Sequence, residues 1–394
     1  MREMVCRPPA PIGGGRADWM LKDGLTFLNH GSFGAVPKLV YDAQDHWRRR
    51  IEAEPIELLG RRCTALLDQA KEKIGSWLGM KPADFGLVTN ATEGINAVLR
   101  SLRFREGDEL LTTNHVYNAV RQAMKYVARQ SGAAFREVEL PLPIGSQEQI
   151  LNAIQDAISP RTRLLVIDHV TSPTAIVFPV ERIAEMCAQR GVDLAVDGAH
   201  APGMLELDVP KIGAAYYAGN LHKWACAPKG SAFIWVRPDR QSQVHPTVIS
   251  HNLDQGFTSE FAWQGTRDIS AHLTAPKAIE FMASFGWERV RRHNHELAVW
   301  AHRMLCERWR VEPISPLDGR MLGSMATVRL PGRLSQLTEE TERKSQQRLY
   351  DEYAIETPLI RWYDGSFLRV SCQIYNRPEE YQRLAGVIEE MSAG

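Results

Sequence analysis

Apolar runs of strand length alternate with helical segments along the first two thirds of this sequence. The runs lie at 85–88, 108–112, 163–168, 192–197, 214–218 and 231–236. Strands that are separated by helices predict an α/β fold, with a mainly parallel sheet that carries helices on both faces. Ligands of such sheets lie at the carboxyl ends of the strands. Because polar clusters follow several of the runs, we expect one functional site along that edge.

The pattern changes after about residue 255. A long helix is expected from Trp287 to Trp309, followed by strands at 324–330 and 366–371 and a last helix that opens near Asn376. This mixture predicts a smaller α+β domain after the large one, which agrees with a length of 394 residues.

We therefore predict three parts: an N-terminal tail at 1–24, a large domain at 25–265 and a small domain at 266–394. Residues 1–20 contain three prolines and a run of three glycines, which is typical of a loose tail.

Composition excludes several classes of protein. Lysine plus arginine and aspartate plus glutamate each total 47, so no net charge draws the chain to nucleic acid or to an anionic membrane. No apolar run approaches the ~18 residues of a membrane span, and no apolar core follows the first arginines as in a secretory signal. The six cysteines are scattered, which predicts reduced thiols and a cytoplasmic protein. His293 and His295 do not share a helix face, so we expect surface residues and no metal site.

Two of the strand-like runs end in residues that suit one cofactor. The run at 192–197 ends in Asp197, and the run at 214–218 leads through Gly-Asn-Leu-His to Lys223. A lysine amine can hold pyridoxal 5′-phosphate (PLP) as a Schiff base, and a carboxylate against the pyridine nitrogen keeps the ring electron-accepting. Taken singly, each residue is more simply a solvated loop lysine or a turn-capping aspartate, whereas the pair favours the cofactor. Lys229 is the rival lysine, but the proline and glycine on either side of it indicate a turn.

Three other positions suit parts of such a site. The segment from Thr89 to Glu93 joins a strand to a helix, where backbone amides bind phosphate well and Thr92 adds a hydroxyl, although an ordinary helix cap has the same pattern. Tyr117 lies on a loop at a strand end, where its ring can stack on a pyridine or simply be buried. Arg369 is flanked by apolar residues and needs an anionic partner, either a substrate carboxylate or an internal salt bridge.

Five segments complete the pattern: LNHGSFG at 28–34, DGAHAPG at 197–203, YAGNLHKW at 217–224, QGTRD at 264–268 and LRVS at 368–371. Together they resemble the fold-type-I (aspartate aminotransferase-like) PLP enzymes of the class V aminotransferase family, and within it the isopenicillin N epimerase-like branch. The resemblance runs from about Leu25 to the C-terminus. It implies PLP as cofactor, a small-molecule amino-acid substrate and a homodimer with shared active sites.

The resemblance also implies a role for each matching residue. Lys223 forms the Schiff base, Asp197 pairs with the pyridine nitrogen, and Arg369 binds the substrate carboxylate. The other cofactor residues that it implies are Tyr117 on the ring face, His200 and Ser172 near the phenolic oxygen, Ala91, Thr92, Asn220 and His222 at the phosphate, and Gly265 and Thr266 at the phosphate of the neighbouring subunit. Asn29 and His30 fall on the substrate side.

Such an enzyme acts at the α-carbon of an amino acid, and epimerisation through loss and return of the α-proton is our first expectation. β-Elimination of a sulfur group from a cysteine conjugate is the second and transamination the third, whereas a non-catalytic binding protein would not need the complete set of charged site residues. Epimerisation requires an acid opposite Lys223, for which Tyr117 and His30 are the candidates, although His30 stands where a threonine is usual in the epimerases. Residues 330–368 contain no cysteine, which disfavours desulfuration through a protein persulfide.

Overall fold

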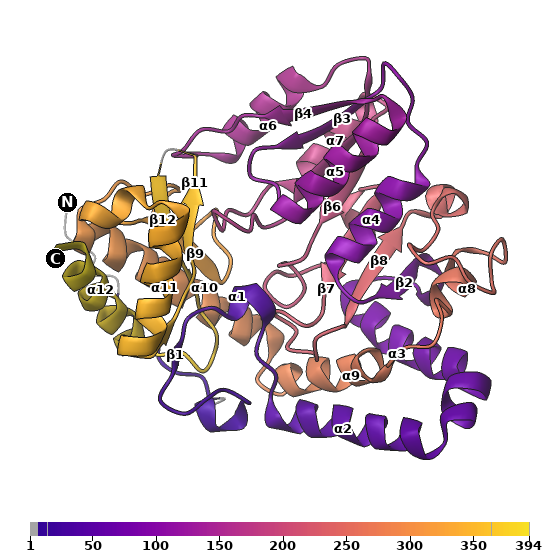
Figure 1. Ribbon diagram of the computed structural model, residues 1–394, viewed down its shortest axis with the longest axis horizontal. Coiled ribbons are helices and arrows are strands. Elements are labelled where there is room, and N and C mark those ends of the chain that lie inside the picture. The colour runs from indigo at the N-terminus through magenta and orange to yellow at the C-terminus, as the bar shows by residue number, and fades with distance from the viewer. Residues whose placement is uncertain (1–6, 14, 364, 394) are drawn as a thin grey trace.

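A seven-stranded sheet forms the centre of the larger part of the molecule (Figure 1). The computed structural model describes residues 7–13, 15–363 and 365–393. The strand order is β2-β8-β7-β6-β5-β3-β4, and β8 runs in the direction opposite to the other six strands. The strands are β2 (Phe85–Val88), β3 (Glu109–Thr113), β4 (Ala134–Val138), β5 (Thr162–Asp168), β6 (Asp193–Asp197), β7 (Tyr216–Asn220) and β8 (Ala232–Val236). The predicted α/β sheet is confirmed, with β4 as an additional strand whose exposed side chains at the sheet edge hide it from an apolar pattern.

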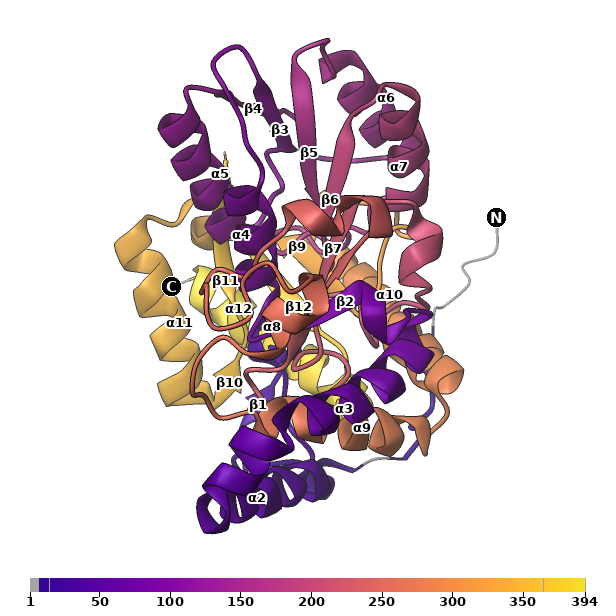
Figure 2. The ribbon, with the colours of Figure 1, turned by 90° about the vertical axis from the view of Figure 1, so that its right-hand side faces the viewer.

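Helices cover both faces of this sheet (Figure 2) because its central strands bury side chains in both directions. Along β5, Leu165 and Ile167 belong to one apolar cluster, and Leu164 and Val166 belong to another. The first cluster takes in α3 (Cys63–Leu78), α6 (Gln147–Ala157), α7 (Val180–Gln189) and α9 (Ser270–Ala283). The second takes in α4 (Ala91–Ser101), α5 (Asn118–Ser131) and α8 (Phe257–Ala262).

The C-terminal part of the chain forms a smaller α+β unit, which is at the left of Figure 1. Its antiparallel sheet has the order β11-β12-β9, and a short parallel pair joins β1 to β10. The strands are β1 (Thr26–Phe27), β9 (Met325–Arg329), β10 (Ile355–Glu356), β11 (Leu359–Trp362) and β12 (Gly365–Ser371). The helices are α10 (Trp287–Trp309), α11 (Glu339–Tyr353) and α12 (Pro378–Ala393). Helix α10 has the bounds that the sequence predicts.

The N-terminal segment links the two units. Helix α1 (His30–Phe33) leads into α2 (Lys38–Ala53), which packs with α3 against α9. The domain boundary at residue 265 stays a prediction. The expectation of a loose tail is wrong at Trp19, which is 1% exposed and contacts the ring of Tyr375 at a centroid distance of 4.8 Å.

The expected surface position is also wrong for His293, which is 4% exposed. Across the described ranges, no three His, Cys, Asp or Glu side chains converge in a way that could hold a metal ion. Within those same ranges, no helix combines the length and the apolar character that crossing a membrane requires.

Candidate active site

Polar residues at the carboxyl ends of the sheet strands converge on one cavity of about 470 Å³. Asp168 and Asp197 end the neighbouring strands β5 and β6 in register, and Asn220 ends β7 beside them. Eight of the residues that the sequence predicts for a site line this cavity: Thr92, Tyr117, Ser172, Asp197, His200, Asn220, His222 and Lys223. The structure therefore brings these residues together at this edge of the sheet.

Lys223 lies in the loop after β7, and its amine contacts a histidine. The Nζ atom is 3.1 Å from Nε2 of His200, and the indole N–H of Trp224 donates to Nδ1 of the same ring at 3.5 Å. Because the indole can only donate, Nδ1 of His200 is an acceptor, and its proton is on Nε2, facing the amine. Burial, together with the charge of Arg369, lowers the pKa of Lys223 to about 7, so that about half of the amine is uncharged at pH 7 and most of it above pH 8.

Two carboxylates face this amine. Asp197 is 3% exposed, and its Oδ1 accepts the N–H of Ala199 at 3.0 Å. Burial raises the pKa of Asp197. For Asp168, burial and the neighbouring Asp197 charge raise the pKa further. Neither carboxylate forms an ion pair with a cation of the described chain at hydrogen-bond distance, which leaves Asp197 available to a positively charged ligand atom.

Arg369 on β12 does not line the cavity itself but lies behind its wall, where it binds two residues that do. It is 4% exposed, and its Nη1 donates to the carbonyl oxygen and hydroxyl of Ser172 at 2.6 and 3.2 Å, while Nη2 donates to the hydroxyl of Ser32 at 3.0 Å. Among the described residues, its Nε has no acceptor and no carboxylate pairs with it. Burial lowers the pKa of Arg369 to about 10, so it stays a cation at neutral pH. The internal salt bridge that we weighed for this arginine is absent from the described part of the chain.

The start of helix α4 closes another side of the cavity. Asn90 caps the helix by accepting the N–H of Glu93 at 2.8 Å, and the N–H of Ala91 donates to Oδ1 of Asn220 at 2.8 Å. Ala91 does not line the cavity, since this bond ties it to β7. Ala91 therefore fixes the helix, Thr92 lines the cavity at the helix start, and phosphate binding by either residue stays a prediction.

His222 lies beside this end of the cavity. Its Nδ1 contacts the carbonyl oxygen of Ser231 at 3.2 Å, so Nδ1 carries the proton of the neutral ring. Burial lowers the pKa of His222 to about 4, which makes the neutral ring the form at neutral pH.

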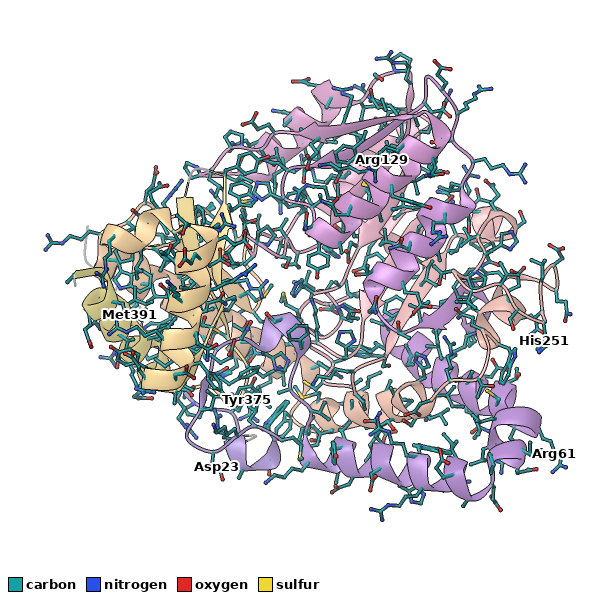
Figure 3. All side chains as sticks on the ribbon, in the orientation of Figure 1. Asp23, Arg61, Arg129, His251, Tyr375 and Met391 are labelled. Atoms are coloured by element: carbon teal, nitrogen blue, oxygen red, sulfur yellow. The ribbon has the colours of Figure 1, made fainter. Side chains whose placement is uncertain are left out.

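His30 does not reach the cavity, and the prediction that it acts on the substrate is revised. It is 0% exposed, with Nδ1 2.9 Å from the hydroxyl of Tyr375 (labelled in Figure 3) and Nε2 3.0 Å from the carbonyl oxygen of Lys223. Burial lowers the pKa of His30 to about 3. With both nitrogens engaged and the ring uncharged, His30 holds the backbone of Lys223 rather than exchanging protons with a ligand.

Asn29 also lies behind the cavity wall. Its Oδ1 accepts the hydroxyl of Ser32 at 2.5 Å, and its Nδ2 donates to Glu356 at 3.0 Å. Asn29 therefore orients Ser32, which binds Arg369, instead of contacting substrate directly. Ser32 itself was not singled out in the sequence, although it lies within the 28–34 segment that carries the resemblance.

Gly265 and Thr266 lie on the loop between α8 and α9, outside the cavity of their own chain. Gly265 has a φ of +95°, a conformation that L side chains rarely adopt, and Thr266 is exposed. Their service to a neighbouring subunit stays a prediction.

These groups fit pyridoxal phosphate. A lysine amine with a lowered pKa, a buried carboxylate without a protein cation and a capped helix start with Thr92 surround one cavity, and they match the aldehyde, the ring nitrogen and the phosphate of that molecule. The fold and the site thus define a PLP-dependent enzyme of fold type I.

Comparison with known proteins gives the family. The family model for aminotransferase class V matches residues 34–384. The isopenicillin N epimerase of Amycolatopsis lactamdurans is 35% identical over 392 residues, which cover 94% of this chain and 96% of that protein. An L-cysteine desulfhydrase of Arabidopsis thaliana is 32% identical over 402 residues, 93% of this chain and 88% of that protein. The chain belongs to the class V aminotransferase family, and its cofactor is pyridoxal 5′-phosphate.

A solved structure supports the fold. The cystine C–S lyase C-DES, solved as a mutant with glycine covalently linked to its PLP cofactor, superposes with a TM-score of 0.83 at 20% identity, covering 95% of this chain and 99% of that one.

Proposed function

We propose that this enzyme epimerises an amino acid by removing the α-proton and returning a proton to the opposite face. The observation that carries the proposal is Arg369, which is buried and has no carboxylate partner in the described chain. Its charge helps to lower the pKa of Lys223, so the two side chains lie near each other. A substrate carboxylate bound there would satisfy the guanidinium and would hold the α-carbon within reach of the lysine amine.

The side chains around the cavity divide the chemistry. When bound, PLP supplies a sink for the electrons left on the α-carbon. We assign Asp197 to the pyridine nitrogen, where a carboxylate keeps the nitrogen protonated. Lys223, whose amine is about half uncharged at pH 7, takes the α-proton from one face. Tyr117, whose side chain lines the cavity and is 43% exposed, is the acid that we assign to the other face.

We also infer a homodimer with shared sites. Gly265 and Thr266 lie outside their own cavity, as residues that serve a neighbouring chain must. Leu39, Tyr41 and Ile56 are 43–69% exposed on α2 and the short helix that follows it, and a second copy of the chain would cover this apolar surface.

A second candidate is β-elimination from cysteine or a cysteine conjugate. The observation that favours it is the similarity to the desulfhydrase over nearly the whole chain. The reaction uses the same removal of the α-proton by Lys223 but needs no acid on the opposite face. Transamination is the third candidate.

The test incubates the PLP-loaded protein in D₂O with L- and D-amino acids, cysteine and S-substituted cysteines. Epimerisation gives inverted product with deuterium at the α-carbon and no keto acid. Release of sulfide, pyruvate and ammonia from cysteine would replace the proposal with the lyase reaction. Tyr117→Phe should suppress inversion while exchange of the α-proton through Lys223 continues, and full inversion in that variant would remove Tyr117 as the second acid.

A further inference from the structure

Asp168 is a buried carboxylate for which the proposed reaction has no use. It is 4% exposed, ends β5 and lies in register with Asp197 on β6. Its hydrogen bonds in the described chain come from two backbone amides and from no cation. Two buried carboxylates side by side cost free energy, and such an arrangement persists chiefly where function requires it.

The two oxygens of Asp168 bind two different loops of the cavity. Oδ1 accepts the N–H of Tyr117 at 3.3 Å, at the start of α5, and Oδ2 accepts the N–H of Ser172 at 3.4 Å, in the loop after β5. Ser172 in turn accepts both bonds of Arg369 Nη1. A continuous set of hydrogen bonds therefore runs from Tyr117 through Asp168 and Ser172 to Arg369.

Through these bonds, Asp168 affects the position of Arg369 without contacting it. The guanidinium of Arg369 has no carboxylate to hold it, so its position depends on Ser172 and Ser32. Bonds within 171–176 hold the rest of this loop, so loss of the bond from the amide of Ser172 to Asp168 would shift Ser172 locally, and Arg369 with it. A displacement of about 1 Å at a group that positions the substrate is enough to reduce the reaction rate by roughly 100-fold.

We propose that Asp168 is a positioning residue that fixes the Ser172 loop and thereby sets Arg369 for the carboxylate of the substrate. The proposal rests on the proposed function in one respect, namely that Arg369 binds that carboxylate. It adds a residue that touches neither the substrate carboxylate nor Arg369 but determines the affinity between them.

Two ligands isolate the effect: glycine, which has an amine and a carboxylate, and methylamine, which has the amine alone. Their dissociation constants are measured from the visible absorption of the PLP-loaded protein, so no turnover is needed. Asp168→Ala should weaken glycine by roughly 10- to 100-fold and leave methylamine unchanged. Asp168→Asn, which keeps the size and one acceptor oxygen, should fall between Asp168→Ala and the unchanged protein and serves if the alanine variant does not fold.

Two further variants make the outcomes distinguishable. Asp193→Asn, at the other end of β6, removes a charge from the same sheet and should leave both constants unchanged. Arg369→Ala should abolish the preference for glycine; if it does not, the proposed carboxylate site is wrong. If Arg369→Ala loses the preference while both Asp168 variants keep it, or if they weaken glycine and methylamine equally, the positioning role of Asp168 is overturned and the carboxylate site stands.

Discussion

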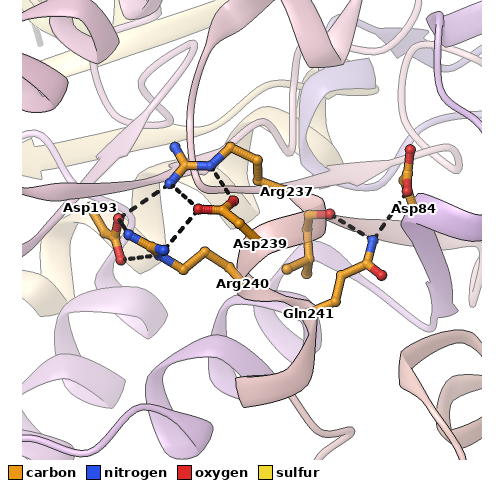
Figure 4. A network of polar contacts seen from close by, with 7 residues as sticks. Asp84, Asp193, Arg237, Asp239, Arg240 and Gln241 are labelled. Atoms are coloured by element: carbon orange, nitrogen blue, oxygen red, sulfur yellow. Dashed lines mark hydrogen bonds and ion pairs between the residues drawn. The ribbon is translucent and has the colours of Figure 1, made fainter.

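Strand β6 begins and ends with an aspartate, and the two residues have opposite surroundings. Asp193 at the amino end binds Arg240 through two hydrogen bonds of 2.9 and 3.1 Å, and Arg237 lies 3.8 Å away (Figure 4). Asp197 at the carboxyl end, four residues later, is buried and accepts only a backbone amide. One strand thus carries a charge that the fold pairs and a charge that the fold leaves unpaired.

The same contrast extends along the whole sheet. At the amino edge, Arg163 pairs with Asp108 and Arg136 with Glu109, both at 2.9 Å. At the carboxyl edge, the buried charges find no partner of opposite sign at hydrogen-bond distance in the described chain. These are Asp168 and Asp197 at the strand ends and Arg369, which binds the loop after β5 from β12. An unpaired buried charge is costly, so the carboxyl edge is organised for a ligand that completes the pairing and the amino edge for the stability of the fold.

The largest effect is expected at Lys223. Lys223→Ala should abolish the covalent link to PLP and turnover, whereas Lys229→Ala should retain both, because the amine of Lys229 donates to the carbonyl oxygen of Gly34 instead. Borohydride reduction followed by peptide mass spectrometry locates the link. Recovery of the cofactor on the Lys229 peptide would reverse the assignment.

The next effect compares the two ends of β6 directly. Asp197→Asn should retain PLP but lose turnover by about 100-fold or more, since a neutral amide cannot stabilise a protonated ring nitrogen. Asp193→Asn should leave turnover unchanged. Rate constants at saturating substrate decide the matter, and equal rates in the two variants would remove the distinction between the ends.

Only part of this site could be predicted from the sequence. Lys223, Asp197 and Arg369 could be identified because each is polar at the end of an apolar run or within one, and that pattern is local. The revised role of His30 could not be foreseen, because its ring is buried by Tyr375, which lies 345 positions away. Asp168 ends its run as Asp197 does, but its value depends on hydrogen bonds to two loops that only the folded chain brings together.

At the carboxyl edge, the rate at which the apoprotein binds PLP should depend on pH through the amine of Lys223. Because the pKa of Lys223 is about 7, the uncharged fraction of its amine falls roughly tenfold per pH unit below pH 7, and above pH 8 nearly all of the amine is uncharged. The rate of PLP capture by the apoprotein should therefore rise from pH 5 to 7 and then level off. Stopped-flow absorbance measures it, and a rate that climbs steadily to pH 10 would indicate an ordinary, solvated lysine.

Removal of a charge should change the free energy of unfolding in opposite directions at the amino and carboxyl edges of the sheet. Arg240→Ala breaks a partly exposed ion pair and should lower the free energy of unfolding by about 1 kcal/mol or less. Asp197→Asn should leave the apoprotein as stable or more stable at pH 8. The reason is that the pKa of Asp197 is raised in the folded state, so its ionisation costs stability as the pH rises through that pKa. Urea unfolding of the two apoproteins tests both signs, and a loss of stability in Asp197→Asn would contradict the view that this charge is strained.

The smallest effect is expected at the cysteines, which neither edge uses. Cys306 lies in α10 and Cys372 directly after β12, both are buried, and burial raises the pKa of each thiol to about 12. The nucleophile in persulfide chemistry is the thiolate, which such thiols scarcely form at neutral pH. Cys226 lies nearer the site, with Sγ 3.9 Å from Nε2 of His30, but it is fully buried beneath Lys223, and burial raises its pKa as well. Cys306→Ala and Cys372→Ala should therefore leave turnover unchanged, and mass spectrometry during turnover with cysteine should detect no protein persulfide. A persulfide on any of the three would mean that the site opens far enough to expose a buried thiol. Reactive groups would then lie in the core beneath Lys223 as well as at the carboxyl edge of the sheet.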